Sequence, residues 1–143
     1  MDPVNLSVTI ARPREEVYAY LADFTTTTEW DPGTVITTRA KGDGGVGTEY
    51  QNTSKFAGRE TELTYVLEEL VPNERIALRG ENKTVVAHDT MDLRSTTTGT
   101  DVAYTVEFEF KGAAKYIEPL IRLPLKKLGD DAQRGMKQAL DAL

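Results

Sequence analysis

The stretch TDVAYTVEFEFKG, residues 100–112, alternates apolar and polar side chains over most of its length. A strand built from it would carry on one face Val102, Tyr104, Val106, Phe108 and Phe110, and on the other Ala103, Thr105, Glu107 and Glu109. A period of two residues is typical of a strand that covers a core with one face only. We therefore expect a half-buried strand here, and the other elements are placed relative to it.

Five more strands are expected before this one, each closed by a short turn. They cover residues 34–40, 46–56, 59–70, 74–80 and 83–95. The turns between them are KGDGG at 41–45, AG at 57–58, PN at 72–73 and TTTGT at 96–100. Consecutive strands joined by short turns form hairpins, whereas parallel strands need long crossovers. The pattern predicts an antiparallel meander.

Helices are predicted near both ends of the chain. Residues 4–10 alternate as a further strand, and residues 12–24 have helical spacing, with Pro13 suited to a first turn. The threonine run that follows predicts a second short helix or an irregular turn. About thirty residues at the C-terminal end repeat apolar side chains at three- and four-residue steps. Pro119 and Pro124 interrupt this pattern, so we expect its first half to be kinked or loosely helical.

This element order predicts an α+β protein of the helix-grip type. A curved seven-stranded antiparallel sheet would wrap around a long C-terminal helix, with two short helices after strand 1. We expect residues 1–143 to form one domain. Several positions expected to face inward are polar, namely Tyr50, Asn52, Tyr65, Asp89 and Tyr104. Burying each without a partner would cost about 1–3 kcal/mol, so the pattern indicates a hollow interior that holds water or a ligand.

Composition narrows the classes of function. The net charge of −6 argues against a nucleic-acid binder, which needs a basic face. The absence of cysteine excludes disulfides and thiol catalysis, and together with the absence of a signal peptide it favours a cytoplasmic location. No apolar run is long enough to cross a membrane. The single histidine, His88, falls on the solvent face by alternation, and we expect neither a metal site nor a cofactor.

Five segments taken together resemble the START-like (SRPBCC) superfamily of polyketide cyclases/dehydrases and lipid-transport proteins. They are ARPREEVYAYLADF, EWDPG, VGTEY, GTDVAYTVEFEFKG and the long C-terminal helix. The family's tryptophan-x-proline signal matches Trp30 and Pro32, and its glycine-threonine strand start matches Gly99 and Thr100. The resemblance implies an apolar cavity between sheet and helix, with a mouth near the short helices. It also implies binding or transport of a hydrophobic small molecule such as a lipid, a sterol or a polyketide-like compound.

Asp89 is the candidate catalytic residue, with two interpretations left open. Strict alternation places it with Ala87, Met91 and Leu93 on the inward face, where burial would raise its pKa and let it act as a general base. A one-residue bulge in VVAHD would instead turn it to solvent. The alternative function is accordingly a polyketide cyclase or dehydratase that uses Asp89, with a tyrosine polarising a carbonyl. A third interpretation is an interaction module whose cavity is only a packing feature.

The other candidate residues concern binding. Trp30, the only tryptophan, either plugs the end of the sheet under the short helices or forms part of the cavity wall, and the two roles are compatible. Asp31 is expected to cap the turn that follows. The predicted ligand-binding set is Trp30, Tyr50, Asn52, Tyr65, Met91, Tyr104, Phe108, Ile117, Leu120 and Ile121.

The segment AAKYIEPLIRLPLKKL, residues 113–128, is amphipathic and basic. Residues 111–143 carry seven Lys/Arg against four Asp/Glu, in contrast to the acidic remainder. One interpretation is a helix that roofs the cavity and lies with a solvated face on an acidic body. The other is transient contact with an anionic membrane surface while a lipid is loaded.

Overall fold

The computed structural model describes residues 2–56 and 58–143, so the first residue of the turn expected at 57–58 lies outside the described residues. The elements in chain order are β1 (Val4–Ile10), α1 (Arg14–Ala22), η1 (Phe24–Thr26), α2 (Thr27–Trp30), β2 (Thr34–Lys41), β3 (Glu49–Phe56), β4 (Arg59–Val71), β5 (Arg75–Glu81), β6 (Val85–Ser95), β7 (Thr100–Phe110), η2 (Gly112–Ile117) and α3 (Glu118–Asp141). The helix-grip prediction is confirmed, and the strand bounds differ from those expected by at most a few residues.

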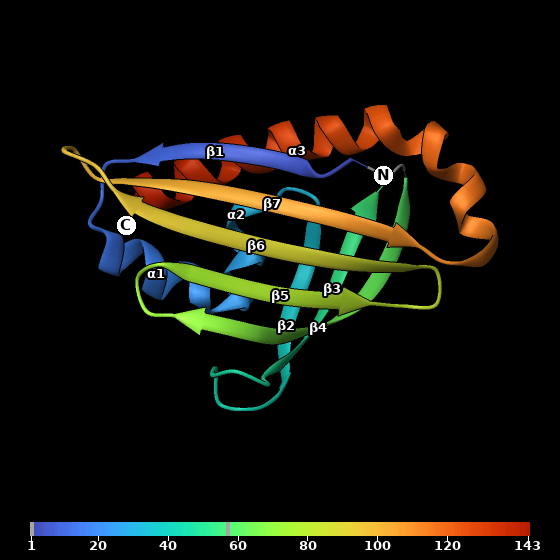
Figure 1. The fold of residues 1–143 in the computed structure, drawn as a ribbon, viewed down its shortest axis with the longest axis horizontal. Coiled ribbons are helices and arrows are strands. Elements are labelled where there is room, and N and C mark those ends of the chain that lie inside the picture. Colours follow the sequence, from blue (N-terminus) through green and yellow to red (C-terminus); the bar gives the residue numbers. More distant parts are fainter. Residues whose placement is uncertain (1, 57) are drawn as a thin grey trace.

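All seven strands form one antiparallel sheet with the order β1-β7-β6-β5-β4-β3-β2. From β2 to β7, each strand pairs with the next strand in the sequence. β1 pairs with β7, so the first and last strands of the chain lie side by side. Figure 1 shows the sheet curving strongly, with β2 and β3 crossing behind β5 and β6, and α3 lying along β1. The concave face of this sheet and α3 enclose the interior.

Register decides which face of β6 points inward. The ladder between β6 and β7 runs from Val85↔Phe110 to Ser95↔Thr100 without a shift, and the ladder between β5 and β6 is equally regular. Strict alternation therefore holds through Asp89, which is 3% exposed. The alternative of a bulge in VVAHD is wrong. The bulges lie elsewhere, in β2 and between Leu67 and Glu69 of β4, where they increase the bend of the sheet.

The C-terminal helix is shorter and more regular than expected. Residues 112–117 form a 3₁₀ helix, and α3 then continues to Asp141. Pro119 lies in the first turn of α3, where its missing N–H would have no intrahelical partner in any case. Pro124 is accommodated inside the helix, and Figure 1 shows the N-terminal part of α3 turned away from the axis of the remainder.

Two glycines let α3 approach its neighbours closely. A Cβ added to Gly135 would lie 2.1 Å from the backbone oxygen of Trp30, and one added to Gly129 would lie 3.0 Å from Cγ1 of Val4. α3 thus packs closely against α2 at Gly135, where only glycine fits, and against β1 at Gly129. Its apolar residues Ala132, Met136 and Leu140 are buried in the core. The first half of α3, by contrast, covers an internal cavity.

Candidate functional site

A cavity of about 470 Å³ lies between the concave face of the sheet and the first half of α3. Every strand except β5 contributes to its wall, together with the helices η1, α2, η2 and α3. Its apolar lining consists mainly of Val4, Leu6, Phe24, Trp30, Phe56, Leu63, Val85, Val106, Phe108, Phe110, Ile117, Ile121, Leu125, Leu128 and Ala132. Its polar lining includes Thr27, Asp31, Thr34, Asn52, Ser54, Arg59, Thr61, Tyr65, Asn82, Thr84, Asp89 and Tyr104.

The exposed lining residues indicate where the cavity opens. Arg59 and Thr61 follow the β3–β4 turn, Thr84 lies in the β5–β6 turn, and Ile117 precedes α3; all four are exposed. The family resemblance implied a mouth near the short helices. The structure places these exposed residues at the other end of the sheet, because η1 and α2 close the end where α3 packs tightly (Figure 1).

Asp89 lies deep in this cavity with one oxygen paired and one not. The Tyr104 hydroxyl donates a hydrogen bond to Oδ2. Oδ1 is buried and has no hydrogen-bond partner among the described residues. Burial raises the pKa of Asp89 to about 7; the bond from Tyr104 acts against this shift, and the charge of Asp31 adds to it. The carboxyl group is therefore able to hold or release a proton near neutral pH.

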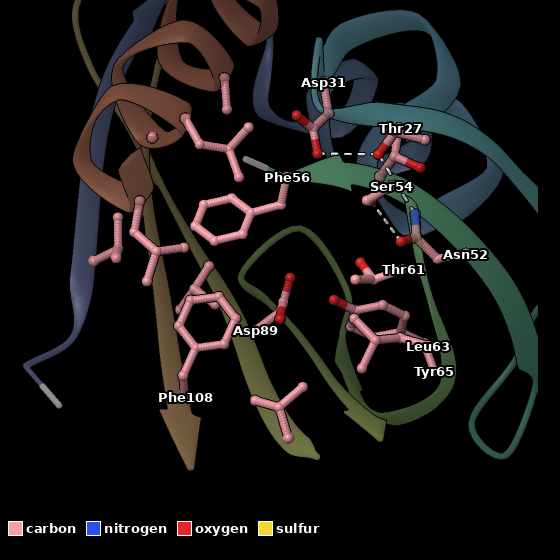
Figure 2. A pocket seen from close by; sticks show the side chains of 18 of the residues that line it. Thr27, Asp31, Asn52, Ser54, Phe56, Thr61, Leu63, Tyr65, Asp89 and Phe108 are labelled. Atoms are coloured by element: carbon pink, nitrogen blue, oxygen red, sulfur yellow. Dashed lines mark hydrogen bonds between the residues drawn. The ribbon is translucent and has the colours of Figure 1, made fainter. Parts of the chain in front are cut away.

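Tyr65 faces Asp89 from β4. Figure 2 shows the Tyr65 hydroxyl and the Asp89 carboxyl both directed into the space bounded by Phe56, Phe108 and Leu63. The ring fits there because Gly80 stands opposite it in β5: a Cβ at Gly80 would lie 2.6 Å from Cε1 of Tyr65. Burial, and then the nearby carboxylates, raise the pKa of Tyr65 well above its usual value. The hydroxyl consequently remains protonated and able to donate.

A hydrogen-bonded group of polar residues lines the wall beneath α2. The Thr34 hydroxyl donates to Oδ2 of Asp31 at 3.0 Å, and the Asn52 amide donates to the Thr37 hydroxyl at 2.8 Å. The Thr37 and Thr27 hydroxyls lie 2.6 Å apart. Asp31 also accepts from the backbone N–H of Gly33, which confirms its expected role as a turn cap. Burial raises the pKa of Asp31 although both hydrogen bonds oppose the shift.

Trp30 combines the two roles that its sequence context left open. Its side chain is 2% exposed and belongs to the core cluster under the short helices. The ring also lies in the cavity lining and meets the Tyr104 ring edge-on, with centroids 5.8 Å apart. Trp30 thus contacts the tyrosine that holds Asp89, and it is well placed to report on an occupant of the cavity.

The structure brings most of the predicted binding residues to one cavity. Its lining contains Trp30, Asn52, Tyr65, Tyr104, Phe108, Ile117 and Ile121, together with Asp89.

Three predicted residues lie elsewhere. Tyr50 is buried, but its ring packs against Phe24, with centroids 5.9 Å apart, and does not reach the lining. Met91 is buried two residues beyond Asp89, in the filled part of the core that includes Met136. Leu120 is 78% exposed because it lies on the outer side of the first turn of α3.

Several lining residues are absent from the predicted ligand-binding set. Ser54 and Phe56 share the inward face of β3 with Asn52, and Leu63 shares that of β4 with Tyr65. Extending the same alternation by four residues along β3 and by two along β4 would have found them. Asp31 and Thr34 carry no such signal, because the turn geometry after α2 directs them inward.

His88 lies on the outward face of β6, as predicted, with Nε2 3.6 Å from Oε2 of Glu109. Within residues 2–56 and 58–143, no three side chains of His, Cys, Asp or Glu gather in a way that would hold a metal ion. None of the helices in this described part of the chain is both long and apolar enough to cross a bilayer.

The fold and the site define a helix-grip protein with an apolar internal cavity that contains a buried carboxyl group. The sequence model of the family described as "Polyketide cyclase / dehydrase and lipid transport" matches residues 1–143, and the chain belongs to this family. No curated protein matches the sequence.

Solved structures with the same fold include an aromatase/cyclase, Zhui, from Streptomyces sp. R1128. It is 16% identical, has a TM-score of 0.83, and the match covers 98% of this chain and 93% of that one. A protein from Thermus thermophilus is 14% identical with a TM-score of 0.83, covering 99% and 98% of the two chains. A di-domain ARO/CYC, BexL, from the BE-7585A biosynthetic pathway is 13% identical with a TM-score of 0.76, covering 99% of this chain and 50% of that one. At these identities the likeness shows the fold alone.

Proposed function

We propose that this protein binds a hydrophobic small molecule in its cavity and positions one polar group of that molecule against Asp89. The observation that carries the proposal is Oδ1 of Asp89, which has no hydrogen-bond partner in the described part of the chain and is buried in a cavity of about 470 Å³. Leaving such an acceptor unpaired costs about 1–3 kcal/mol, and more if it is charged. A cavity of this size with a few convergent polar groups is the usual build of a small-molecule site.

The family described for polyketide cyclases/dehydrases and lipid transport supports the same class of ligand. The body of the ligand would lie against Phe108, Phe110 and Phe56, between the deep polar end and the exposed residues of the opening. Each Å² of apolar surface removed from water there contributes about 25 cal/mol. Binding would therefore depend on the apolar body for affinity and on the polar end for orientation.

Blocking the cavity tests this proposal. Ile121 lies in the lining, whereas the adjacent Leu120 points outward. Ile121→Trp should weaken binding of a neutral naphthalene derivative such as 2-naphthol by tenfold or more, measured by calorimetry, and Leu120→Trp should leave it unchanged. Chemical-shift changes confined to the cavity lining of β3, β4, β6, β7 and α3 would locate the probe. Equal binding by both variants, or no binding by the wild type, would overturn the proposal.

One observation favours a second function, catalysis of cyclisation or dehydration. Asp89 combines a pKa of about 7 with a hydrogen bond from Tyr104, and Tyr65 offers a second hydroxyl in the same space. A carboxylate of this kind can remove a proton next to a ketone, while the Tyr65 hydroxyl donates to the developing enolate oxygen. Asp89→Asn should abolish turnover of a poly-β-ketone substrate while leaving its binding within a fewfold. Unchanged turnover would exclude this role.

The opening of the cavity also supports membrane contact. Tyr116 is 85% exposed, Leu120 78% and Ile117 48%, and Lys115 and Lys126 lie exposed in the same segment. Exposed apolar side chains with flanking cations bind anionic bilayers. We propose that the segment of residues 113–128 touches the lipid surface from which a hydrophobic ligand enters. Flotation with phosphatidylserine-containing vesicles tests it, and no binding at low ionic strength would refute it.

A further inference from the structure

The charges that face the cavity are unevenly placed. Two carboxyl groups, those of Asp31 and Asp89, lie in its deep part and interact electrostatically with each other. Arg59 is the one cationic residue in the lining among the described residues, and it is exposed at the opening. A ligand whose deep end is a carboxylate or a phosphate would meet like charges there without a compensating cation.

The hydrogen-bond donors of the deep cavity wall are largely engaged by the protein. The Thr34 hydroxyl donates to Asp31, the Asn52 amide donates to Thr37, and the Tyr104 hydroxyl donates to Oδ2 of Asp89. What remains is a buried acceptor, Oδ1 of Asp89, and the hydroxyl of Tyr65, which enters none of these bonds. The site thus offers an acceptor from β6 and a donor from β4, on either side of β5, to the same space.

A hydroxyl group matches this pair, because it donates one hydrogen bond and accepts another. We propose that the ligand is a neutral apolar alcohol or phenol whose hydroxyl donates to Oδ1 of Asp89 and accepts from the Tyr65 hydroxyl, and that the cavity discriminates against carboxylates. This inference rests on the proposed binding function and specifies the chemical class of its ligand. The hydroxyl end lies innermost, since the apolar residues Phe108 and Phe110 stand between Asp89 and the opening.

The alternatives fit less well. A hydrocarbon leaves Oδ1 unpaired, so the cost of burying that acceptor persists in the complex. An alkylammonium would pair with Asp89 but has no lone pair to accept from the Tyr65 hydroxyl, and its three donors exceed the two acceptors at this end, Oδ1 of Asp89 and the Tyr65 oxygen. A free fatty acid would place a negative charge beside two carboxyl groups. Each alternative therefore predicts a distinct order of affinities.

A matched series of probes tests the proposal on the full chain at pH 8. The probes are 2-naphthol, 2-methylnaphthalene, 2-naphthoate and 2-naphthylmethylamine, which share one ring system and differ at one substituent. Quenching of the single tryptophan and calorimetry give each Kd. We expect 2-naphthol to bind about tenfold or more tightly than the other three, the difference that a hydrogen bond to a buried carboxylate provides. In Asp89→Leu the preference for 2-naphthol over 2-methylnaphthalene should fall to within about twofold.

The outward-facing Asp92 supplies the control, since Asp92→Asn removes a carboxylate from the same strand without reaching the cavity. Asp89→Asn, which keeps the side-chain shape, serves if the leucine variant does not fold, and it should reduce the preference at least severalfold. Tightest binding of 2-naphthoate or of the amine would overturn the hydroxyl assignment, as would equal binding of 2-methylnaphthalene, while the binding function would stand. Failure of all four probes to bind would overturn the binding function itself.

Discussion

Tyr104 of β7 and Asp89 of β6 are hydrogen-bonded diagonally across the sheet. Asp89 stands opposite Val106 in the ladder, and Tyr104 stands opposite Met91, two residues away on the same face. The Tyr104 hydroxyl reaches across this diagonal to Oδ2 of the carboxyl group. Long aromatic side chains span this diagonal separation readily, and here the reach leaves Oδ1 turned to the cavity.

Removing this hydrogen bond should raise the pKa of Asp89. The bond stabilises the carboxylate form, so Tyr104→Phe loses a contribution that opposes the effect of burial. We expect the pKa of Asp89 to move upward from about 7 in this variant. A pH titration of aspartate carboxyl carbons by NMR measures it, with Asp89→Asn providing the assignment.

Tyr20→Phe is the matched control, because the Tyr20 hydroxyl donates to Glu29 outside the cavity. It should leave the titration of Asp89 unchanged. An Asp89 resonance that titrates at the same pH in wild type and in Tyr104→Phe would show that the hydrogen bond does not govern the carboxyl group.

Stability should depend on pH through Asp89. The folded-state pKa of about 7 lies above the usual value of 3.8, so the folded protein keeps a proton that the unfolded chain releases between these values. The contribution of Asp89 to the free energy of unfolding is therefore greatest below pH 4, and it is lost as the pH rises through 7. The shift corresponds to about 4 kcal/mol.

Asp89→Asn removes this pH-dependent contribution to the free energy of unfolding. The difference in unfolding free energy between wild type and Asp89→Asn, measured in urea at several values between pH 4 and pH 8, should move in favour of the variant as the pH rises. Asp92→Asn, on the outward face, should follow the wild type over the same interval. Parallel curves for wild type and Asp89→Asn would contradict the raised pKa.

Alanine at Gly135 should destabilise the protein, although alanine normally favours a helix over glycine by about 1 kcal/mol. The added Cβ would lie 2.1 Å from the backbone oxygen of Trp30, which cannot move without displacing α2. We expect a loss of about 2 kcal/mol or more in thermal or urea unfolding.

Gly129→Ala is the comparison within the same helix. Its Cβ would meet only the side chains of Val4 and Leu6, at 3.0 and 3.3 Å, which can shift slightly. The helix propensity gained then offsets the contact, and the variant should remain within about 1 kcal/mol of wild type. Equal losses at both glycines would show that the close approach of α3 to α2 is not the cause.

Exposed apolar residues at the opening should govern vesicle binding. Tyr116→Ser together with Leu120→Ser removes the two most exposed large apolar side chains of the described chain and should reduce flotation with anionic vesicles several-fold. Val46→Ser is the control, because Val46 is 64% exposed in the β2–β3 connection, away from the α3 segment. A similar reduction by the control variant would indicate nonspecific adsorption.

The alternation in residues 4–10 and 100–110 and the short turns between the other strands were sufficient to predict seven antiparallel strands. They also placed Tyr65, Tyr104 and Asn52 correctly, since a period of two leaves only two choices. Alternation alone left Asp89 undecided, because a single bulge reverses the face, and only the continuous ladder between β6 and β7 excluded the bulge.

Only the tertiary structure determines whether an inward side chain meets other side chains or borders the cavity. Tyr50 and Tyr65 both point inward and both rings pack against Phe24, with centroids 5.9 and 4.8 Å apart, yet only Tyr65, which stands opposite Gly80, reaches the cavity lining. Leu120 and Ile121 are neighbours of equal hydrophobicity, and the angle at which α3 lies over the sheet turns one outward and the other into the cavity. A cavity exists where packed elements fail to meet, and that distance depends on contacts between segments far apart in the chain. Local periodicity determines the direction of a side chain and carries no information about that distance.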